Sequence, residues 1–279
     1  MNEKKAGVIG LGRIGGGVAV SLTKSGRIPV CYDVVEDAYA KWAPHLTGQA
    51  KSLKELGDCD VVMIAVFDAK QCMSVLEGEE GLLANMKPGS AIVILSTVGI
   101  DDIKNMYRMC KEKGIYLLDS GVSPGQLSDQ NGLIALTGGD DEGIEMAMPV
   151  LQDWAKEVIH CGGSGAGMAA KLARNMITFD SWRVTTEAAR MAVKMGVKPQ
   201  ALVDGLLACD RQQPDLYYNL IIKRASDENF NLSPGASSYL IPYMQKDLKS
   251  ALEAAKAVGA AAPVTEQVLE LVEDTVSNL

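Results

Sequence analysis

Histidine is the scarcest side chain of this 279-residue sequence, which contains only His45 and His160. They are far apart, and neither lies in a carboxylate or thiol pattern typical of a metal site, so we expect no metal and no catalytic zinc. The six cysteines are scattered and form no C-x-x-C pair. This spacing favours reduced, mostly buried thiols in a cytoplasmic protein over a disulfide framework.

Basic residues are also in deficit, because 27 Lys and Arg against 35 Asp and Glu give a net charge of −8. A broad basic surface for nucleic-acid phosphates or an anionic membrane is therefore not expected. No stretch of the sequence approaches the roughly 20 uninterrupted apolar residues of a membrane-spanning helix. We expect neither nucleic acid nor a membrane as a partner, although a local positive pocket for a small anion remains compatible with the net charge.

The first half of the chain alternates short apolar runs, rich in Val and Ile, with segments of helical periodicity. Runs of this length suit strands that are buried on both faces of a parallel sheet. The pattern predicts an α/β fold with a doubly wound parallel sheet. The predicted strands are Ala6–Ile9, Ile28–Tyr32, Val61–Val66, Ala91–Leu95, Ile115–Leu118 and Ile134–Thr137.

Strand-like runs stop after about His160. A glycine-rich stretch, 162–167, leads into a long helical pattern that reaches about Met195, where Gly196 and Pro199 predict its end. We therefore expect a first domain over 1–162 and an all-α second domain over 163–279. Its further predicted helices are Gln200–Ala208, Asp215–Ala225, Tyr239–Val258 and Pro263–Ser277, with a turn at 231–235.

A glycine fingerprint, Gly10-Leu11-Gly12-Arg13-Ile14-Gly15, follows the first predicted strand and opens a helix. In this context the first glycine permits a tight turn, the second lets the backbone approach a pyrophosphate, and the third allows close helix–strand packing. The anion would lie at the helix N-terminus. These residues predict a dinucleotide-binding Rossmann domain, with a turn that binds no ligand as the alternative.

The second predicted strand ends close to Asp33, about twenty residues beyond the glycines. An acidic side chain there accepts hydrogen bonds from the adenosine ribose and repels a 2′-phosphate. Val34 and Val35 follow, so no adjacent arginine is available for that phosphate. The sequence therefore favours NAD over NADP, and an uninvolved turn aspartate is the alternative.

Two further strand ends are expected at the same edge of the sheet. Val66 and Phe67 end one strand, and Ser96 with Thr97 follow another, so we expect Val66, Phe67 and Thr97 to contact the cofactor. Ser96 and Thr97 could equally cap the predicted helix Ile100–Cys110, and Asp101 is a third candidate for that cap.

The helix after Gly167 is mostly apolar, yet Lys171, Arg174, Asn175 and Thr178 share one face at helical spacing. A partly desolvated lysine has a lowered pKa and can exchange a proton near neutrality. A solvated polar stripe on a surface helix is the alternative explanation.

Four ordered motifs give the chain a resemblance to a known family. The glycine fingerprint comes first; residues 119–125 (DSGVSPG), continuing to Gly132-Leu133, are similar to a D-A-P-V-S-G-G loop that ends in G-x-L. Residues 165–175 (GAGMAAKLARN) are similar to G-x-G-x-x-x-K-x-x-N-N, and residues 246–248 match K-D-L. Together they resemble the β-hydroxyacid dehydrogenases, the group of 3-hydroxyisobutyrate dehydrogenase, tartronate semialdehyde reductase and the nucleotide-binding part of 6-phosphogluconate dehydrogenase.

The resemblance implies a role for each matching residue. Lys171 would be the proton donor and acceptor, Asn175 would orient the substrate, and Ser123 with the nearby backbone of Pro124 and Gly125 would bind its carboxylate. Lys246 would lie beside the nicotinamide, and Asp247 would fix the local helix. The implied substrate is a small anionic hydroxy acid or aldehyde acid, bound in a cleft between the two domains, and the implied assembly is a homodimer or homotetramer.

Three departures from the family pattern bear on the substrate. Pro124 replaces a glycine, Gly121 replaces a proline, and Arg174 replaces the first asparagine of the N-N pair. A pocket unlike that of 3-hydroxyisobutyrate enzymes is expected. Arg174 could clamp a second anionic group if it points inward, or face solvent or a partner subunit. An imine reductase-like enzyme and a non-catalytic NAD-binding sensor remain as alternatives.

Overall fold

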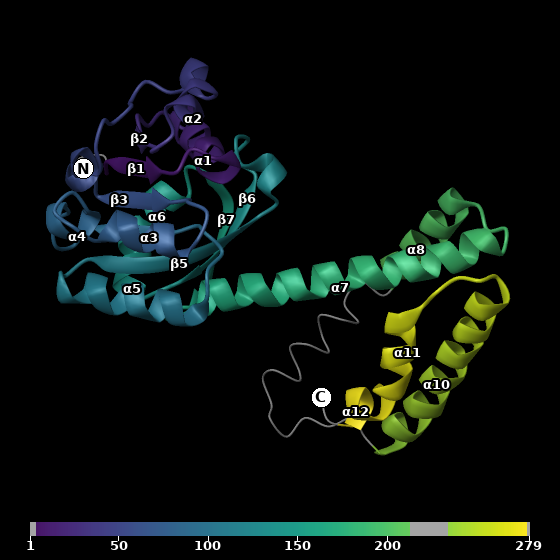
Figure 1. The fold of residues 1–279 in the computed structure, drawn as a ribbon. Coiled ribbons are helices and arrows are strands. Elements are labelled where there is room, and N and C mark those ends of the chain that lie inside the picture. Colours follow the sequence, from purple (N-terminus) through teal and green to yellow (C-terminus); the bar gives the residue numbers. More distant parts are fainter. Residues whose placement is uncertain (1–3, 213–233, 278–279) are drawn as a thin grey trace. The chain divides into compact units, whose positions relative to one another are not determined.

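A computed structural model describes residues 4–212 and 234–277 (Figure 1). The chain divides into two compact units, Met1–Asn175 and Met176–Leu279, and the division falls inside helix α7 (Ala166–Lys194). The predicted helix Asp215–Ala225 lies outside the described residues, as does the first part of the turn predicted at 231–235.

A seven-stranded sheet forms the centre of the first unit, in the order β2-β1-β3-β4-β5-β6-β7. All six predicted strands are present, and the first five in this order run parallel. The expected α/β fold with a doubly wound sheet is therefore confirmed. The strands are β1 (Ala6–Ile9), β2 (Val30–Tyr32), β3 (Val61–Ile64), β4 (Ala91–Ile94), β5 (Tyr116–Ser123), β6 (Leu133–Gly138) and β7 (Ala155–Gly162).

Helices cover both faces of this sheet and form a separate apolar core on each face (Figure 1). Helices α1 and α6 pack on one face, and α3, α4 and α5 pack on the other. Alternate strand residues supply the two cores, so Val8 faces one and Ile9 faces the other. The helices are α1 (Arg13–Lys24), α2 (Glu36–Ala40), α3 (Ala69–Leu76), α4 (Leu82–Asn85), α5 (Ile100–Glu112) and α6 (Asp141–Leu151), with short 3₁₀ turns at Ala43–His45, Leu53–Asp58 and Gly125–Leu127.

The sheet departs from a fully parallel arrangement at β6, which pairs antiparallel with β5. Only residues 124–132 separate these strands, which is too short for a parallel crossover of a dozen or more residues. Strand β7 was not predicted, because half of its residues are exposed and its polar side chains interrupt the apolar run. Strand β5 also extends to Ser123, beyond the predicted end at Leu118.

The alternative explanation of Ser96, Thr97 or Asp101 as a side-chain cap of α5 is not supported by the structure. The helix begins after Gly99 and has no side-chain cap, so neither Ser96, Thr97 nor Asp101 fills that position. Ser96 instead donates from Oγ to the Val66 carbonyl at 2.7 Å, which joins the segments that follow β3 and β4.

Every described element of the second unit is a helix, as expected. After α7 come α8 (Pro199–Gln212), α10 (Pro234–Ala257), α11 (Pro263–Glu270) and α12 (Val272–Ser277). Gly196 adopts a φ of 93°, a left-handed conformation that suits glycine and ends α7 as predicted. The single helix predicted over Pro263–Ser277 is divided at Leu271. Among the described residues, no helix combines the length and apolar character needed to span a bilayer.

Glu187 of α7 is 1% exposed and accepts hydrogen bonds at the start of α11. The donors are the backbone N–H groups of Val264 and Thr265 and the Thr265 hydroxyl, and Arg183 donates from its own helix at 2.8 Å. Burial acts to raise the pKa of Glu187, but these hydrogen bonds outweigh it and lower the pKa below its ordinary value. The carboxylate therefore caps α11 in the absence of a local side-chain cap.

We expect Glu187→Gln to lower the melting temperature at neutral pH, because an amide accepts fewer of these hydrogen bonds. Since the folded pKa is lowered, the stabilisation is complete above the ordinary glutamate pKa of about 4.3 and is lost as the pH falls through the lowered value. Circular dichroism melts should show wild type and variant converging in acid. A constant difference would contradict the assignment; Glu266→Gln, at an exposed position in the first turn of α11, is the control.

Candidate functional site

The glycine fingerprint forms the turn between β1 and α1. Gly10 has a φ of 86°, and a Cβ there would lie 2.5 Å from the Ala65 carbonyl oxygen. A Cβ on Gly15 would lie 1.9 Å from the Gly10 carbonyl oxygen. Both positions therefore require glycine, and the turn brings the backbone and the N-terminus of α1 to the carboxyl edge of the sheet.

A cavity of about 680 Å³ opens at this edge. Its size and its mainly apolar walls suit a nucleotide-sized ligand. The predicted cofactor residues that line it are Gly10, Gly12, Arg13, Ile14, Asp33, Val66 and Phe67, and the other lining residues include Tyr32, Leu53, Gln71, Ser74 and Val75. Leu11 and Gly15 are buried in the turn itself.

Asp33 lies in this cavity immediately after β2 and is half-buried. Its Oδ2 accepts from the Leu11 N–H at 2.6 Å, and its Oδ1 accepts from the Val35 N–H at 2.8 Å. An ionised carboxylate has about four acceptor sites, so capacity remains for ribose hydroxyls. Asp33 thus joins the glycine turn to the second strand and presents negative charge to the cavity.

Asp119 fixes the start of α7 against β5. Its carboxylate is completely buried and accepts from the backbone N–H groups of Gly165 and Met168, each at 2.6 Å. Burial raises the pKa of Asp119, and hydrogen bonds from the helix N-terminus partly offset that rise. The contact satisfies helix N–H groups that would otherwise be buried without acceptors.

Two glycines allow α7 and β5 to approach closely. A Cβ on Gly167 would lie 2.4 Å from the Asp119 and Leu136 carbonyl oxygens, and a Cβ on Gly121 would lie 2.2 Å from Cβ of Lys171. Gly121, which departs from the family pattern, therefore lies directly against Lys171. This approach brings the Lys171 ammonium within 2.7 Å of the Val122 carbonyl oxygen, to which it donates.

The ionisation of Lys171 is shifted by this environment. Partial burial lowers its pKa, and the positive charge of Arg174 lowers it further. Asn175 is half-buried, whereas Arg174 is exposed and donates to Oδ1 of Asn175 at 3.3 Å. Lys171, Arg174 and Asn175 therefore lie together on α7, and Lys171 contacts the carbonyl of Val122, the residue before the predicted substrate loop.

The predicted substrate loop, Ser123-Pro124-Gly125, continues from the carbonyl that Lys171 contacts. A Cβ on Gly125 would lie 3.2 Å from Cδ1 of Ile14, so this loop also reaches the glycine fingerprint. Ser128, just beyond it, donates from Oγ to the Arg13 carbonyl at 3.0 Å. The loop therefore joins the lysine and the cofactor turn within the first unit.

Neither Thr97 nor Lys246 is among the residues that line the cavity at the glycine turn. Thr97 is exposed and follows β4. Lys246 lies on α10 in the second unit, where its ammonium is 3.3 Å from Oδ1 of Asp247 and 5.2 Å from the centre of the Tyr243 ring. Within the described residues, no group of three or more His, Cys, Asp or Glu side chains is arranged to bind a metal ion.

Both halves of the chain match family descriptions. Residues 5–163 match the family described as the NAD binding domain of 6-phosphogluconate dehydrogenase. Residues 165–279 match the family described as NAD-binding of NADP-dependent 3-hydroxyisobutyrate dehydrogenase. The chain belongs to the β-hydroxyacid dehydrogenase family. It is accordingly an oxidoreductase with a nicotinamide-cofactor domain, and the glycine turn, the cavity and Asp33 fit such a cofactor.

Individual proteins and a solved structure are also similar to this chain. An uncharacterised oxidoreductase of Mycobacterium tuberculosis is 34% identical over 71% of this chain and 68% of that protein. An NAD-dependent L-serine dehydrogenase of Pseudomonas aeruginosa is 27% identical over 96% of this chain and 91% of that protein. The imine reductase from a Pseudomonas species shares the fold, with a TM-score of 0.78, 17% identity and coverage of 97% of this chain and 93% of that one.

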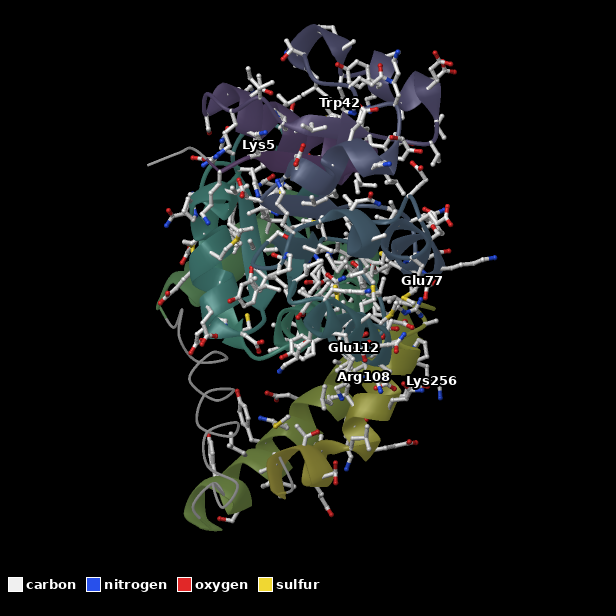
Figure 2. All side chains as sticks on the ribbon, turned by 90° about the vertical axis from the view of Figure 1, so that its left-hand side faces the viewer. Lys5, Trp42, Glu77, Arg108, Glu112 and Lys256 are labelled. Atoms are coloured by element: carbon white, nitrogen blue, oxygen red, sulfur yellow. The ribbon has the colours of Figure 1, made fainter. Side chains whose placement is uncertain are left out.

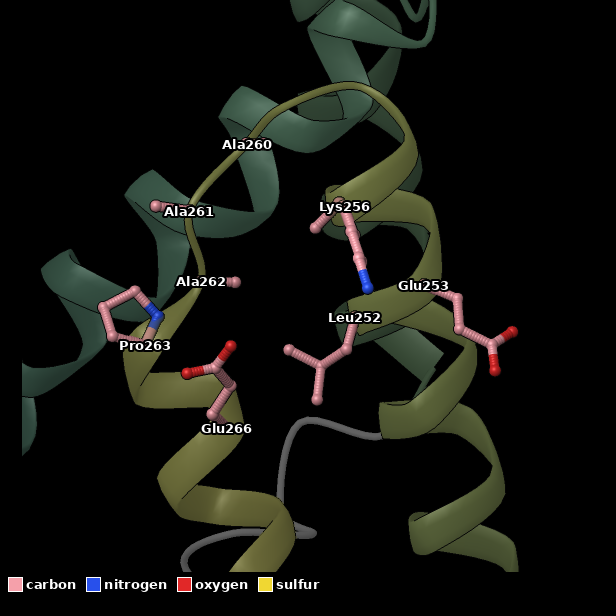
Figure 3. Close-up of a pocket in the computed structure, with 9 residues that line it drawn as sticks. Leu252, Glu253, Lys256, Ala260, Ala261, Ala262, Pro263 and Glu266 are labelled. Atoms are coloured by element: carbon pink, nitrogen blue, oxygen red, sulfur yellow. The ribbon is translucent and has the colours of Figure 1, made fainter.

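A second cavity, about 440 Å³, lies between α10 and α11 in the second unit (Figure 3). Leu252 and Lys256 line one wall, and Pro263 and Glu266 line the other. It contains none of the residues predicted to bind cofactor or substrate. The cavity at the glycine turn is therefore the one that matches the sequence motifs.

Sequence reasoning missed two parts of the site in this dehydrogenase. From the sequence, Asp119 was identified only as part of the motif at residues 119–125. An aspartate that precedes a helix-opening glycine stretch is a candidate for a long-range helix cap. Gln71 was missed entirely. Its Oε1 accepts from the Phe67 N–H at 3.0 Å, and its own N–H donates to Asp68, the cap of α3.

We expect Asp119→Ala to destabilise the dehydrogenase by about 2–4 kcal/mol, because two buried N–H groups at the start of α7 lose their acceptor. Urea unfolding of the full chain gives the measurement. Asp101→Ala removes an exposed acid from the first turn of α5 and should cost less than about 1 kcal/mol. Equal decreases in the free energy of unfolding for the two substitutions would contradict a large stabilisation by the buried Asp119 contact.

Proposed function

We propose that the chain is an NAD-dependent dehydrogenase of a small anionic 3-hydroxy acid, or a reductase of the corresponding semialdehyde. The observation that carries this proposal is the position of Lys171. Its ammonium lies 2.7 Å from the Val122 carbonyl, at the start of the predicted carboxylate-binding loop, and its pKa is lowered. A lysine that loses its proton more easily in such a place is suited to general acid–base catalysis.

Proton movement follows from this arrangement. In oxidation, neutral Lys171 accepts the substrate hydroxyl proton at Nζ while the carbon–oxygen double bond forms. In reduction, its ammonium donates a proton to the carbonyl oxygen. The bound nicotinamide supplies the hydride chemistry. Asn175 would orient the substrate, and Ser123 with the backbone around Gly125 would bind its carboxylate.

The substrate class draws support from the relatives and from the departures in the loop. One relative acts on L-serine, whose hydroxyl is on the carbon β to its carboxylate. Gly121, Pro124 and Arg174 favour a substrate other than 3-hydroxyisobutyrate, and an inward Arg174 would suit a second anionic group. An imine reductase is the alternative enzyme, and Lys171 argues against it because that group typically lacks the lysine. Turnover of hydroxy acids would exclude the sensor alternative.

Self-association is part of the proposal. One short segment of α7 carries four apolar side chains that are each more than half exposed: Met176, Ile177, Phe179 and Trp182. Several apolar side chains gathered on one exposed helix segment are typical of protein interfaces. A homodimer or homotetramer would cover them.

We expect Lys171→Met to lower kcat by about 10²- to 10⁴-fold in both directions while NADH still binds, because the proton acceptor and donor is lost. Absorbance at the nicotinamide band measures turnover on a panel of 3-hydroxy acids and semialdehydes. In the wild type, the rate of oxidation should rise with pH and then level off, since the neutral amine is required. The midpoint of this rise should lie below the ordinary lysine pKa.

Lys171→Arg is the matched control for charge. It retains a cation but cannot deprotonate in the accessible pH range, so oxidation should be lost as in Lys171→Met. Near-normal oxidation by either variant would remove Lys171 from the mechanism. NADH binding by the wild type with no turnover on any compound would favour the sensor.

We expect Asp33→Asn to reduce the preference for NAD over NADP, because it removes the charge that repels a 2′-phosphate and keeps a hydrogen-bond acceptor. The ratio of kcat/KM values should fall by at least about tenfold, as close like charges cost more than about 1.4 kcal/mol. Asp37→Asn, at an exposed position on α2, should leave the ratio unchanged. An unaltered ratio in Asp33→Asn would show that this carboxylate does not determine the preference between NAD and NADP.

A further inference from the structure

Trp42 contacts the glycine turn from outside the cofactor cavity. It follows α2 by two residues, is half-buried, and is labelled near the top of the view in Figure 2. Its indole Nε1 donates to the Leu11 carbonyl at 2.9 Å. A Cβ on Gly16 would lie 2.0 Å from the same nitrogen, so the indole edge also lies directly against the first turn of α1.

These contacts constrain both peptide units of Leu11, the residue between the first two glycines of the fingerprint. The N–H of Leu11 donates to Asp33 at 2.6 Å, its carbonyl accepts from Trp42, and its side chain is 2% exposed. Leu11 is therefore bound on each side by a group from a different segment of the chain.

The orientation of one peptide unit follows from the contact with Trp42. In a planar trans peptide, the C=O and the N–H point to opposite sides. Because Trp42 binds the Leu11 carbonyl, the N–H of the same unit, which belongs to Gly12, points away from Trp42. Gly12 lines the cofactor cavity, whereas Trp42 does not.

We propose that Trp42 is a positioning residue for the dinucleotide, whose indole N–H orients the Leu11–Gly12 peptide so that the Gly12 N–H donates to the cofactor pyrophosphate. This inference rests on the nicotinamide cofactor occupying the glycine-lined cavity. Without the indole donor, the Leu11 carbonyl loses the hydrogen bond that fixes the plane of this peptide unit, and the Gly12 N–H is held less firmly in the orientation that binds the cofactor. Trp42 therefore acts on cofactor affinity through Leu11 and takes no part in hydride or proton transfer.

The test is Trp42→Phe in the full-length chain, which keeps an aromatic ring against Gly16 and removes the N–H. Loss of one such hydrogen bond corresponds to an increase of about 3- to 10-fold in the Kd for NADH, measured by the fluorescence of the nicotinamide. KM for the dinucleotide should rise by a similar factor, while kcat at saturating cofactor stays within about twofold of wild type, because the reacting groups are unaltered.

Trp154→Phe is the matched control. Trp154 is completely buried, and its Nε1 has no hydrogen-bond partner among the described residues. This substitution should lower the melting temperature and leave the Kd for NADH unchanged. An unchanged Kd in Trp42→Phe, or an equal rise in both variants, would overturn the proposal. Absence of NADH binding by the wild type would instead reject the proposed function.

A measurement on a chain that retains Trp42 covers the case in which Trp42→Phe fails to fold. Trp154→Phe and Trp182→Phe assign two of the three indole ¹⁵N–H resonances, which leaves the third to Trp42. Saturation with NAD should shift the Trp42 resonance, since its acceptor belongs to the turn that binds the cofactor, and should leave that of Trp154 in place. An unmoved Trp42 resonance with bound cofactor would overturn the proposal.

Discussion

The position of Lys171 depends on the contact between the Asp119 carboxylate and the N-terminus of α7. A buried carboxylate is costly unless its oxygens are hydrogen-bonded, and here two backbone N–H groups at 2.6 Å satisfy it. The same contact sets where α7 leaves the sheet. Lys171 lies just over a turn further along α7, so the Asp119 contact also fixes its position beside Val122.

The glycine turn of the same unit is also held in place by contacts from other segments, and here backbone groups form the surface that faces the cavity. Gly10 and Gly15 permit the turn, while Asp33 contacts it from the second strand and Trp42 from the segment after α2. Preformed donors cost less conformational entropy on binding than donors that must be ordered by the ligand. One side chain that lines the cavity, Asp33, and one outside it, Trp42, therefore hold the backbone of the glycine turn in place.

The sequence was sufficient for the fold class because periodicity and glycine placement are local properties. Val61–Ile64 and its neighbours are apolar on both faces, and Gly10 and Gly196 adopt the conformations that their positions predicted. Strand β7 and the capping partners could not be predicted in this way. The edge position of β7 removes the apolar signal, and the acceptors for α7 and α11 come from residues 46 and 77 positions away. Such pairings depend on the folded chain.

Ser21 of α1 connects this helix to residues 128–131 through a single hydroxyl group. It donates to the Ser128 carbonyl at 2.8 Å and accepts from the Asn131 N–H at 3.0 Å, while Asn131 also donates to the Ser21 carbonyl. The segment after the predicted substrate loop is thus bound to the helix that begins at the glycine turn. A loop grafted from a relative between β5 and β6 therefore has to preserve these hydrogen bonds, so residues 123–131 form a single unit of exchange that must be compatible with α1.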